Sequence, residues 1–215
     1  MIHRSKQKFA LAGLWDRIGI AKELCEDFES HIAAKVRELD LNAVEIAKFD
    51  DDDHRDAAYD GLDERQHRYS SEWTSLLRES LFLALCSSFE HYVTRFADAY
   101  AEYESMPFKC RDLNDRGIRA CETLMRRAGL STKAFQSEWR KLKELYLIRN
   151  RIAHGGGDHN DETRNLVKRY PTIFSVPTRE KVEILPHGIS SLCEIMTAAL
   201  RQINIQGNMT KAPAK

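Results

Sequence analysis

The stretch Leu145-Tyr146-Leu147-Ile148-Arg149-Asn150-Arg151-Ile152-Ala153-His154-Gly155-Gly156-Gly157 decides how the 215-residue chain can fold. Its three glycines end a segment in which apolar residues recur at three- and four-residue spacing, as in an amphipathic helix. The apolar stripe of this segment consists of Trp139, Leu142, Leu145, Tyr146, Ile152 and Ala153. At about 100° per residue, Arg149 falls near the middle of the stripe, so we expect it to have an acidic, phosphate or water partner.

The motif helix is predicted to run from Lys133 to His154, after a capping Ser131 or Thr132. Asn150 and His154 are four residues apart and share one flank of it. Arg149 and His154 are five residues apart, about 140° around the helix, which is awkward for holding a single phosphate. A two-fold dimer joined along the motif helices would bring a second set of these residues opposite the first.

A second long helix is predicted from Leu62 to about Tyr103, and it is apolar on most sides, as a central helix would be. Glu90 lies on one of these apolar sides, near Leu83 and Ala97, which is unusual for a carboxylate. We expect Glu90 to pair with Arg149, either as a structural ion pair or to orient the guanidinium for catalysis.

The pattern Arg149-Asn150-x-x-x-His154 resembles the signature of the HEPN superfamily, whose all-α domains often act as metal-independent ribonucleases. That signature is an Arg, usually followed by a polar residue, with a His four to six positions after the Arg. The segment Ser87-Ser88-Phe89-Glu90-His91-Tyr92 is similar to the Glu-bearing second helix of the RiboL-PSP and related HEPN groups. The resemblance covers roughly residues 70–205 and implies catalytic roles for Arg149, Asn150, His154 and Glu90.

In that chemistry His154 would act as general acid or base without a metal, because imidazole titrates near neutrality. Arg149 would offer forked donors to the phosphate as negative charge accumulates. Asn150 would hold either the second imidazole nitrogen or a phosphate oxygen. The expected products are a 2′,3′-cyclic phosphate (or 3′-phosphate) and a 5′-hydroxyl, and DNA should resist because it lacks the 2′-hydroxyl.

The resemblance also implies a homodimer with paired motifs and a role as a toxin or an effector of antiviral defence. Such proteins often act on transfer RNA, and an antitoxin or regulatory protein would fit as a further partner. A second function stays open at this point: a catalytically silent α-helical binding or regulatory module. There, Arg149 and Glu90 would form only a buried ion pair, and His154 would only cap the helix C-terminus, where the dipole favours it.

The charge of the chain is balanced overall but unevenly distributed. Residues 1–104 carry 13 basic and 22 acidic side chains, whereas residues 105–169 carry 15 basic and 8 acidic ones. The basic excess surrounds the motif, where a polyanion would bind, although solvated and salt-bridged helix faces explain it as well. A short helix predicted from Leu113 to Ala128, with Gly129 as its stop, could contact phosphates through Arg116. The residues expected to bind RNA are Arg119, Arg126, Arg127 and Arg151.

The predicted fold is an all-α, HEPN-like helical bundle with an added N-terminal helix and at most a short β-hairpin before the last helix. Residues 1–49 are expected to form an N-terminal helical segment packed on the core. The run Asp50-Asp51-Asp52-Asp53 opens a segment, residues 50–61, that is expected to be an exposed acidic linker. The bundle would then cover residues 62–206, and residues 207–215 would form a disordered tail.

Cysteines and hydrophobic runs narrow the class of protein. The five cysteines are widely scattered, with no Cys-x-x-Cys pair, which favours reduced thiols in a cytoplasm over a disulfide framework or a zinc site. No metal ligand set or cofactor motif is recognised. The longest apolar run, Leu81 to Cys86, is too short to span a membrane, and no signal peptide is visible. We therefore expect a cytoplasmic protein that does not bind a membrane.

Overall fold

The fold is all-α with one short β-hairpin before the last helix, as the sequence predicts. The computed structural model describes residues 2–131, 133–155, 161–175 and 181–209. Its long helices are α1 (Ile2–Ile46), α3 (Thr74–Tyr103) and α7 (Gly188–Met209), and α2 (Asp52–His67) runs into α3 through the π-helical turn η1 (Arg68–Trp73). The shorter elements are the 3-10 turns η2 (Cys110–Asp112) and η3 (Lys133–Phe135), the helices α4 (Ile118–Arg127), α5 (Gln136–Gly155) and α6 (Asp161–Val167), and the strands β1 (Phe174–Ser175) and β2 (Glu183–Ile184).

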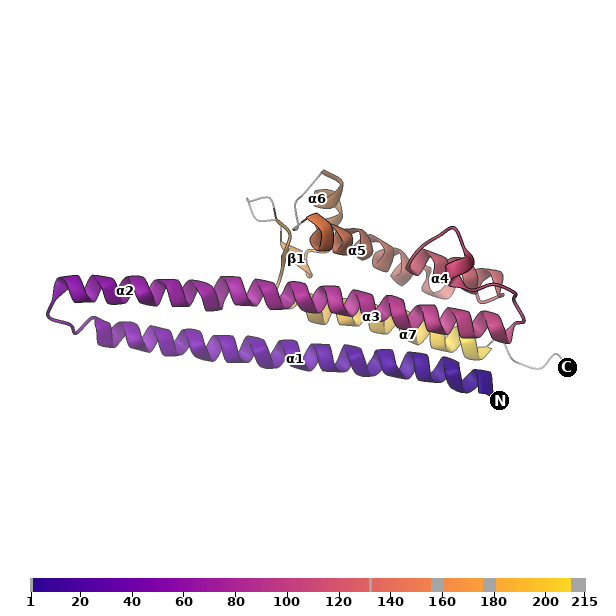
Figure 1. The fold of residues 1–215 in the computed structure, drawn as a ribbon, viewed down its shortest axis with the longest axis horizontal. Helices are drawn as coiled ribbons and strands as arrows, with labels where there is room; N and C mark the ends of the chain where they lie inside the picture. The colour runs from indigo at the N-terminus through magenta and orange to yellow at the C-terminus, as the bar shows by residue number, and fades with distance from the viewer. Residues whose placement is uncertain (1, 132, 156–160, 176–180, 210–215) are drawn as a thin grey trace.

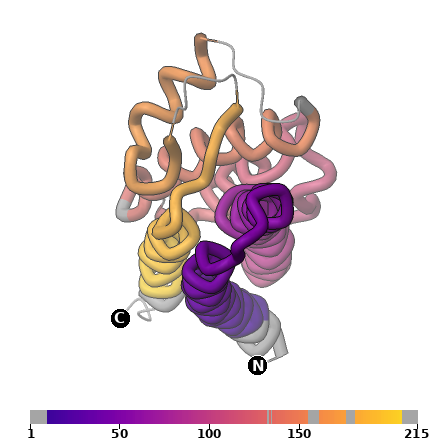
Figure 2. Tube along the Cα trace, turned by 90° about the vertical axis from the view of Figure 1, so that its left-hand side faces the viewer, coloured from indigo at the N-terminus to yellow at the C-terminus, as the bar shows by residue number. Residues whose placement is uncertain are grey.

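The helices form two layers. Viewed end-on, α1, α3 and α7 lie side by side, and the chain from α4 to α6 covers α3 and α7 from the other side (Figure 2). The two strands pair antiparallel, with Phe174 opposite Ile184. In the long view, α2 and the C-terminal part of α1 extend as a two-helix projection beyond the remaining helices (Figure 1).

One hydrophobic core joins both layers. Residues 10–25 of α1 contribute Leu14 and Ile18 to this core, so the N-terminal helix packs on it as expected. The predicted stripe of α5 is buried at five of its six positions, but Ala153 is exposed and Ile148 is fully buried instead. The reason is that α5 packs against both α3 and α7, which moves the buried face toward the side that carries Ile148.

The acidic run is part of a helix, so the prediction of a linker at residues 50–61 is wrong. Asp51 is the N-cap of α2, and its side chain accepts hydrogen bonds from the backbone N–H groups of Asp53 (3.0 Å) and His54 (3.1 Å). Asp52 and Asp53 occupy the first turn, where the helix dipole favours negative charge. Clustered aspartates therefore start a helix here instead of separating two domains.

Several other predicted boundaries are also corrected. The helix expected from Leu62 is the continuation of α2, which already starts at Asp52. The motif helix proper starts at Gln136 because its first residues form the tighter turn η3, and Thr132 lies outside the described residues. At the other end, α7 continues to Met209, so the predicted tail starts too early. Residues 210–215 of that tail lie outside the described residues.

Helix α4 starts five residues later than the predicted Leu113, because the backbone of Gly117 is not helical and turns the chain just before the helix. Gly117 is the N-cap of α4 with φ +60° and ψ −142°, a conformation that side chains with a Cβ rarely adopt. The C-terminal stop is as predicted: Gly129 has φ +87°, and the Leu130 N–H bonds to the Met125 carbonyl at 2.9 Å. The loop before α4 is therefore free to form one wall of a cavity.

Candidate active site

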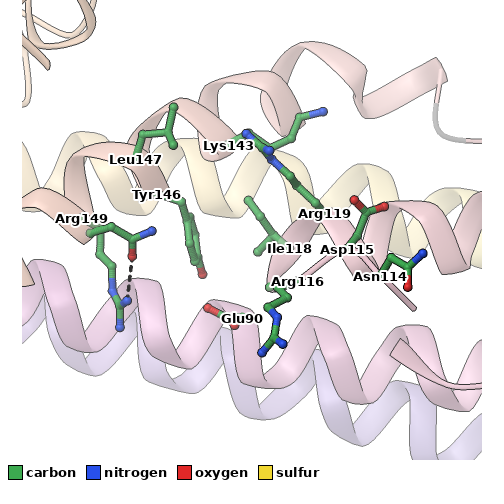
Figure 3. A pocket seen from close by; sticks show the side chains of 12 residues that line it. Glu90, Asn114, Asp115, Arg116, Ile118, Arg119, Lys143, Tyr146, Leu147 and Arg149 are labelled. Atoms are coloured by element: carbon green, nitrogen blue, oxygen red, sulfur yellow. Dashed lines mark hydrogen bonds between the residues drawn. The ribbon is translucent and has the colours of Figure 1, made fainter. Parts of the chain in front are cut away.

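A cavity of about 500 Å³ opens between α3, α4 and α5, beside the motif. Basic side chains reach it from three elements: Arg116 from the loop before α4, Arg119 from α4, and Lys143 and Arg149 from α5. In Figure 3, Arg149 and Arg116 extend toward α3 from the two ends of the cavity, and Glu90 lies between them. We call this space the motif cavity.

The guanidinium of Arg149 is held by two neutral oxygens. Its Nη1 donates to Asn150 Oδ1 at 2.9 Å, and its Nη2 donates to Ser87 Oγ on α3 at 3.1 Å. The Nε–H of Arg149 is buried, and no hydrogen-bond partner for it is found among the described residues. Arg149 is thus fixed at the edge of the cavity with its full positive charge and one unused donor.

The expected pairing of Glu90 with Arg149 is wrong, because no ion pair within 4.0 Å joins them among the described residues. The register of two antiparallel helices explains this. The hydroxyl of Tyr146 donates to the Cys86 carbonyl in the buried interface between α5 and α3. Three residues further along α5, Arg149 then lies opposite Ser87, away from Glu90.

Glu90 faces the start of α4 instead. A Cβ placed on Gly117 would lie 3.3 Å from Glu90 Oε1, so the carboxylate packs directly against this glycine. The N-terminal end of a helix favours a negative charge beside it, which stabilises Glu90 without an arginine. Burial raises the pKa of the nearby Cys86 thiol to about 12. The charge of Arg149 lowers this pKa, and the charge of Glu90 raises it.

His154 opens onto a second cavity, of about 290 Å³, which lies between α5 and α6. Arg151, Glu162 and Leu166 also line this space, which we call the histidine cavity. His154 and Arg149 therefore point into different cavities of one chain, as their angular separation predicts. Asn150 borders both cavities, and so does Leu147.

Asn150 does not hold the imidazole in this arrangement, because its Oδ1 accepts from Arg149. Its side chain is exposed, and His154 is exposed too. Lys143, Leu147, Asn150 and His154 follow one another at four- and three-residue steps, so they form a single line along the open face of α5. This line connects the motif cavity with the histidine cavity.

The predicted RNA-binding arginines are only partly brought together. Arg119 lines the motif cavity and Arg151 the histidine cavity, whereas Arg126 and Arg127 are exposed in the last turn of α4 and line neither. The guanidinium of Arg127 lies 5.8 Å from the centre of the Phe108 ring, within the range of a cation–π contact.

The sequence does not single out two residues of the site: Ser87, which accepts a hydrogen bond from Arg149, and Lys143, which lines the motif cavity. Lys143 could have been found, since it is seven residues before Asn150 and so lies on the same helix face. It is paired with Glu122, with 2.7 Å between Lys143 Nζ and Glu122 Oε2. The motif cavity is lined by four basic side chains, and the carboxylates of Glu90 and Asp115 line it as well.

Comparison of the chain with family models, curated proteins and solved structures found no match. None of the described helices is long and apolar enough to cross a membrane. Within the described part of the chain, no group of three or more His, Cys, Asp and Glu side chains is arranged to hold a metal ion.

Proposed function

We propose that the chain is a metal-independent endoribonuclease of the HEPN type, in which Arg149 and His154 act on the scissile phosphate of RNA. The observation that carries the proposal is the state of Arg149. A partly buried guanidinium, held by Ser87 and Asn150 and by no carboxylate among the described residues, faces a cavity that Arg116 and Arg119 also line. Such a preorganised, permanently charged donor set suits a phosphate group whose negative charge grows during the reaction.

The roles of the residues follow from their chemistry. The 2′-hydroxyl of RNA attacks the adjacent phosphorus, and the 5′-oxygen leaves. His154 supplies the acid or base at one of these oxygens, since histidine is the side chain that most often serves in general acid–base catalysis. Arg149 stabilises the phosphorane. Asn150 and Ser87 serve as positioning residues that hold the guanidinium in one orientation.

The proposal includes a homodimer joined along α5. One copy directs Arg149 and His154 into different cavities, so a single phosphate would meet Arg149 from one copy and His154 from the other. The exposed line from Lys143 to His154 on α5, including Leu147 at 38% exposure, is the face that the second copy would cover.

The first test is incubation of purified protein with bulk transfer RNA in EDTA, with His154→Ala and Arg149→Lys as variants. We expect cleavage by the wild type to leave 2′,3′-cyclic phosphate ends, and the His154→Ala variant to be slower by about 100-fold or more. Arg149→Lys keeps the charge but loses the two-pronged donor, so a comparable loss is expected. His31→Ala, at an exposed position of α1, is the matched control and should cleave like the wild type.

Mixing two variants that should each be inactive alone, Arg149→Ala and His154→Ala, tests the dimer. If each site combines Arg149 of one copy with His154 of the other, a mixed dimer of Arg149→Ala and His154→Ala contains one intact site. Activity should then return on mixing. A mixture that stays inactive, or a monomer in analytical ultracentrifugation that still cleaves RNA, would refute the shared site while leaving the ribonuclease proposal standing.

A second candidate function is a catalytically silent α-helical binding or regulatory module. The observation that favours it is that Glu90 and the Lys143–Glu122 pair place carboxylates in and beside the motif cavity, where they weaken anion binding. This candidate predicts that neither the wild type nor His154→Ala cleaves RNA, although both are folded. Equal cleavage by both proteins would instead indicate a contaminating nuclease or another site.

A further inference from the structure

Two thiols beside the motif cavity are in contact with each other. Cys110 lies in η2 and Cys121 in α4, and their Sγ atoms are 3.9 Å apart. Both side chains are buried, with 6% and 0% of their surface exposed. All five cysteines of the chain are free thiols. Among the described residues, a thiol–thiol hydrogen bond is found between Cys110 and Cys121.

The surroundings of the pair favour a thiolate on one of the two sulfurs. The Cys110 thiol donates to Cys121 Sγ, and the Thr94 hydroxyl lies 3.3 Å from the same sulfur. The hydrogen bond from Cys110 lowers the pKa of Cys121 and raises that of Cys110, and burial opposes the first effect. A thiolate is the nucleophilic form of cysteine, so the pair is chemically different from an inert buried thiol.

A small oxidant can reach the pair from a cavity of about 600 Å³ that Cys110 lines. Arg111 and Arg116 line the same space. The charges of Glu90 and Asp98 act against a thiolate on Cys121, so the hydrogen bonds from Cys110 and Thr94 are what lower its pKa. The cavity is bounded by Glu90, Asn114 and Gly117 as well, all of which also line the motif cavity. The thiol pair thus lies behind one wall of the candidate active site.

We propose that Cys110 and Cys121 form a reversible disulfide when the protein meets hydrogen peroxide. One thiolate attacks a peroxide oxygen, the O–O bond breaks, and a sulfenic acid and water result. The second sulfur attacks the sulfenic sulfur, the S–O bond breaks, and the S–S bond forms with loss of a second water. The two thiols are together oxidised by two electrons, and the peroxide is reduced to two molecules of water.

The bond requires only a local movement. A disulfide is about 2 Å long, so the two sulfurs must approach each other by about the same distance. Cys110 lies in a three-residue 3-10 turn next to a loop, which can shift more easily than α4. The new ring would contain Asn114, Asp115, Arg116 and Gly117, all of which line the motif cavity. Oxidation would therefore fix the wall that presents Arg116.

Trypsin makes this disulfide directly observable. It cuts after Lys109, Arg111, Arg119 and Arg126, so Cys110 and Cys121 leave on two separate short peptides. The purified, freshly reduced protein is treated with one to a few equivalents of hydrogen peroxide, its remaining thiols are alkylated, and the digest is analysed by mass spectrometry. We expect Cys110-Arg111 linked to Ala120–Arg126, and the two peptides separate and alkylated after treatment with dithiothreitol.

Serine variants supply the controls. Cys110→Ser and Cys121→Ser should each abolish the linked peptide, whereas the double variant Cys25→Ser/Cys193→Ser should form it as the wild type does. The wild-type digest alone decides the matter if a variant fails to fold. Alkylation of all five cysteines after peroxide treatment, or a linkage through another cysteine, would overturn the proposal. None of these readouts depends on ribonuclease activity.

Discussion

The two ends of the molecule are built from helices of similar regularity but are stabilised very differently. We call residues 26–72 the arm; it contains the C-terminal part of α1, all of α2 and most of η1, and it projects from the bundle (Figure 1). Its buried residues are Ile32, Leu39 and Leu62, and none of them belongs to the main hydrophobic core. Helix α5 alone has more fully buried side chains than the whole arm.

Charge follows the same division. The arm has 15 acidic and 6 basic residues, whereas residues 105–155, which we call the motif end, have 12 basic and 5 acidic ones. The ion pair of Arg78 with Glu29, at 2.6 Å, marks the base of the arm. Helical periodicity thus tells which residues share a face, but the number of neighbouring elements decides how much each face stabilises.

The largest expected difference between the two ends is the cost of removing a leucine. Leu142→Ala, in the core of the motif end, should lower the free energy of unfolding by about 2–5 kcal/mol, because the closely packed surroundings cannot collapse into the cavity. Leu39→Ala, in the arm, should cost about 1 kcal/mol in the same urea titration, since two helices can relax around it. Equal losses at both positions would contradict the difference in packing between the arm and the core of the motif end.

The sequence predicted the elements of the fold well because burial on one face leaves a periodic trace. Leu14 and Ile18 in α1 and Trp139 and Leu142 in α5 all lie in the core at the expected positions. The prediction for the acidic run was wrong because the first turn of a helix and an exposed linker can both be rich in aspartate. Only the two hydrogen bonds that Asp51 accepts distinguish them.

For the candidate site, the sequence predicted which way Arg149 faces but not which residue it contacts. The position of Arg149 within the stripe correctly indicated that it faces another helix. Which residue it meets there depends on the register of α5 against α3, and the Tyr146 hydrogen bond to the Cys86 carbonyl sets that register. No pattern within either helix contains this information, so Glu90 was chosen where Ser87 is the partner.

Two glycines should respond to alanine with opposite signs. Gly117→Ala puts a Cβ at a residue with φ +60° and 3.3 Å from Glu90 Oε1, so it should destabilise the protein by about 1–2 kcal/mol. Gly61→Ala lies within α2 with no atom near the new Cβ, so it should stabilise the helix by about 0.5–1 kcal/mol. Thermal unfolding of both variants measures the difference, and the same sign for both would contradict it.

Alkaline pH should weaken the motif end and its surroundings before the arm. Burial raises the pKa of the Cys86 thiol to about 12, whereas an unfolded cysteine titrates near 8.5. Below the pKa of the unfolded thiol, both the folded and the unfolded states keep the proton, so this group does not change the free energy of unfolding with pH. As pH rises further, only the unfolded state loses the proton, so stability should fall by at most about 1.4 kcal/mol per pH unit for this group.

Cys86→Ala isolates this contribution. Urea titrations at pH 8, 9 and 10 should show a smaller decline for the variant than for the wild type, although the variant is less stable throughout. The remaining slope would come mainly from the other thiols whose pKa burial raises, among them Cys25 and Cys193. The arm contains no cysteine, so its amide exchange, corrected for intrinsic rates, should change little over the same range. An identical slope for wild type and variant would remove Cys86 from the explanation.

The smallest expected effect concerns the cap of the arm, and it tests whether the arm opens independently. Asp51→Ala removes the acceptor of the Asp53 and His54 N–H groups, which should destabilise the start of α2 by about 1 kcal/mol. If the arm opens without the core, hydrogen exchange at these amides and their neighbours in α2 should accelerate about fivefold, with almost no change in global unfolding. Asp50→Ala, one residue earlier, provides the matched control and should leave exchange in α2 unchanged. If Asp51→Ala lowered the global free energy of unfolding by its full local cost, the arm and the motif end would unfold as one cooperative unit, and the contrast in their burial would have no energetic counterpart.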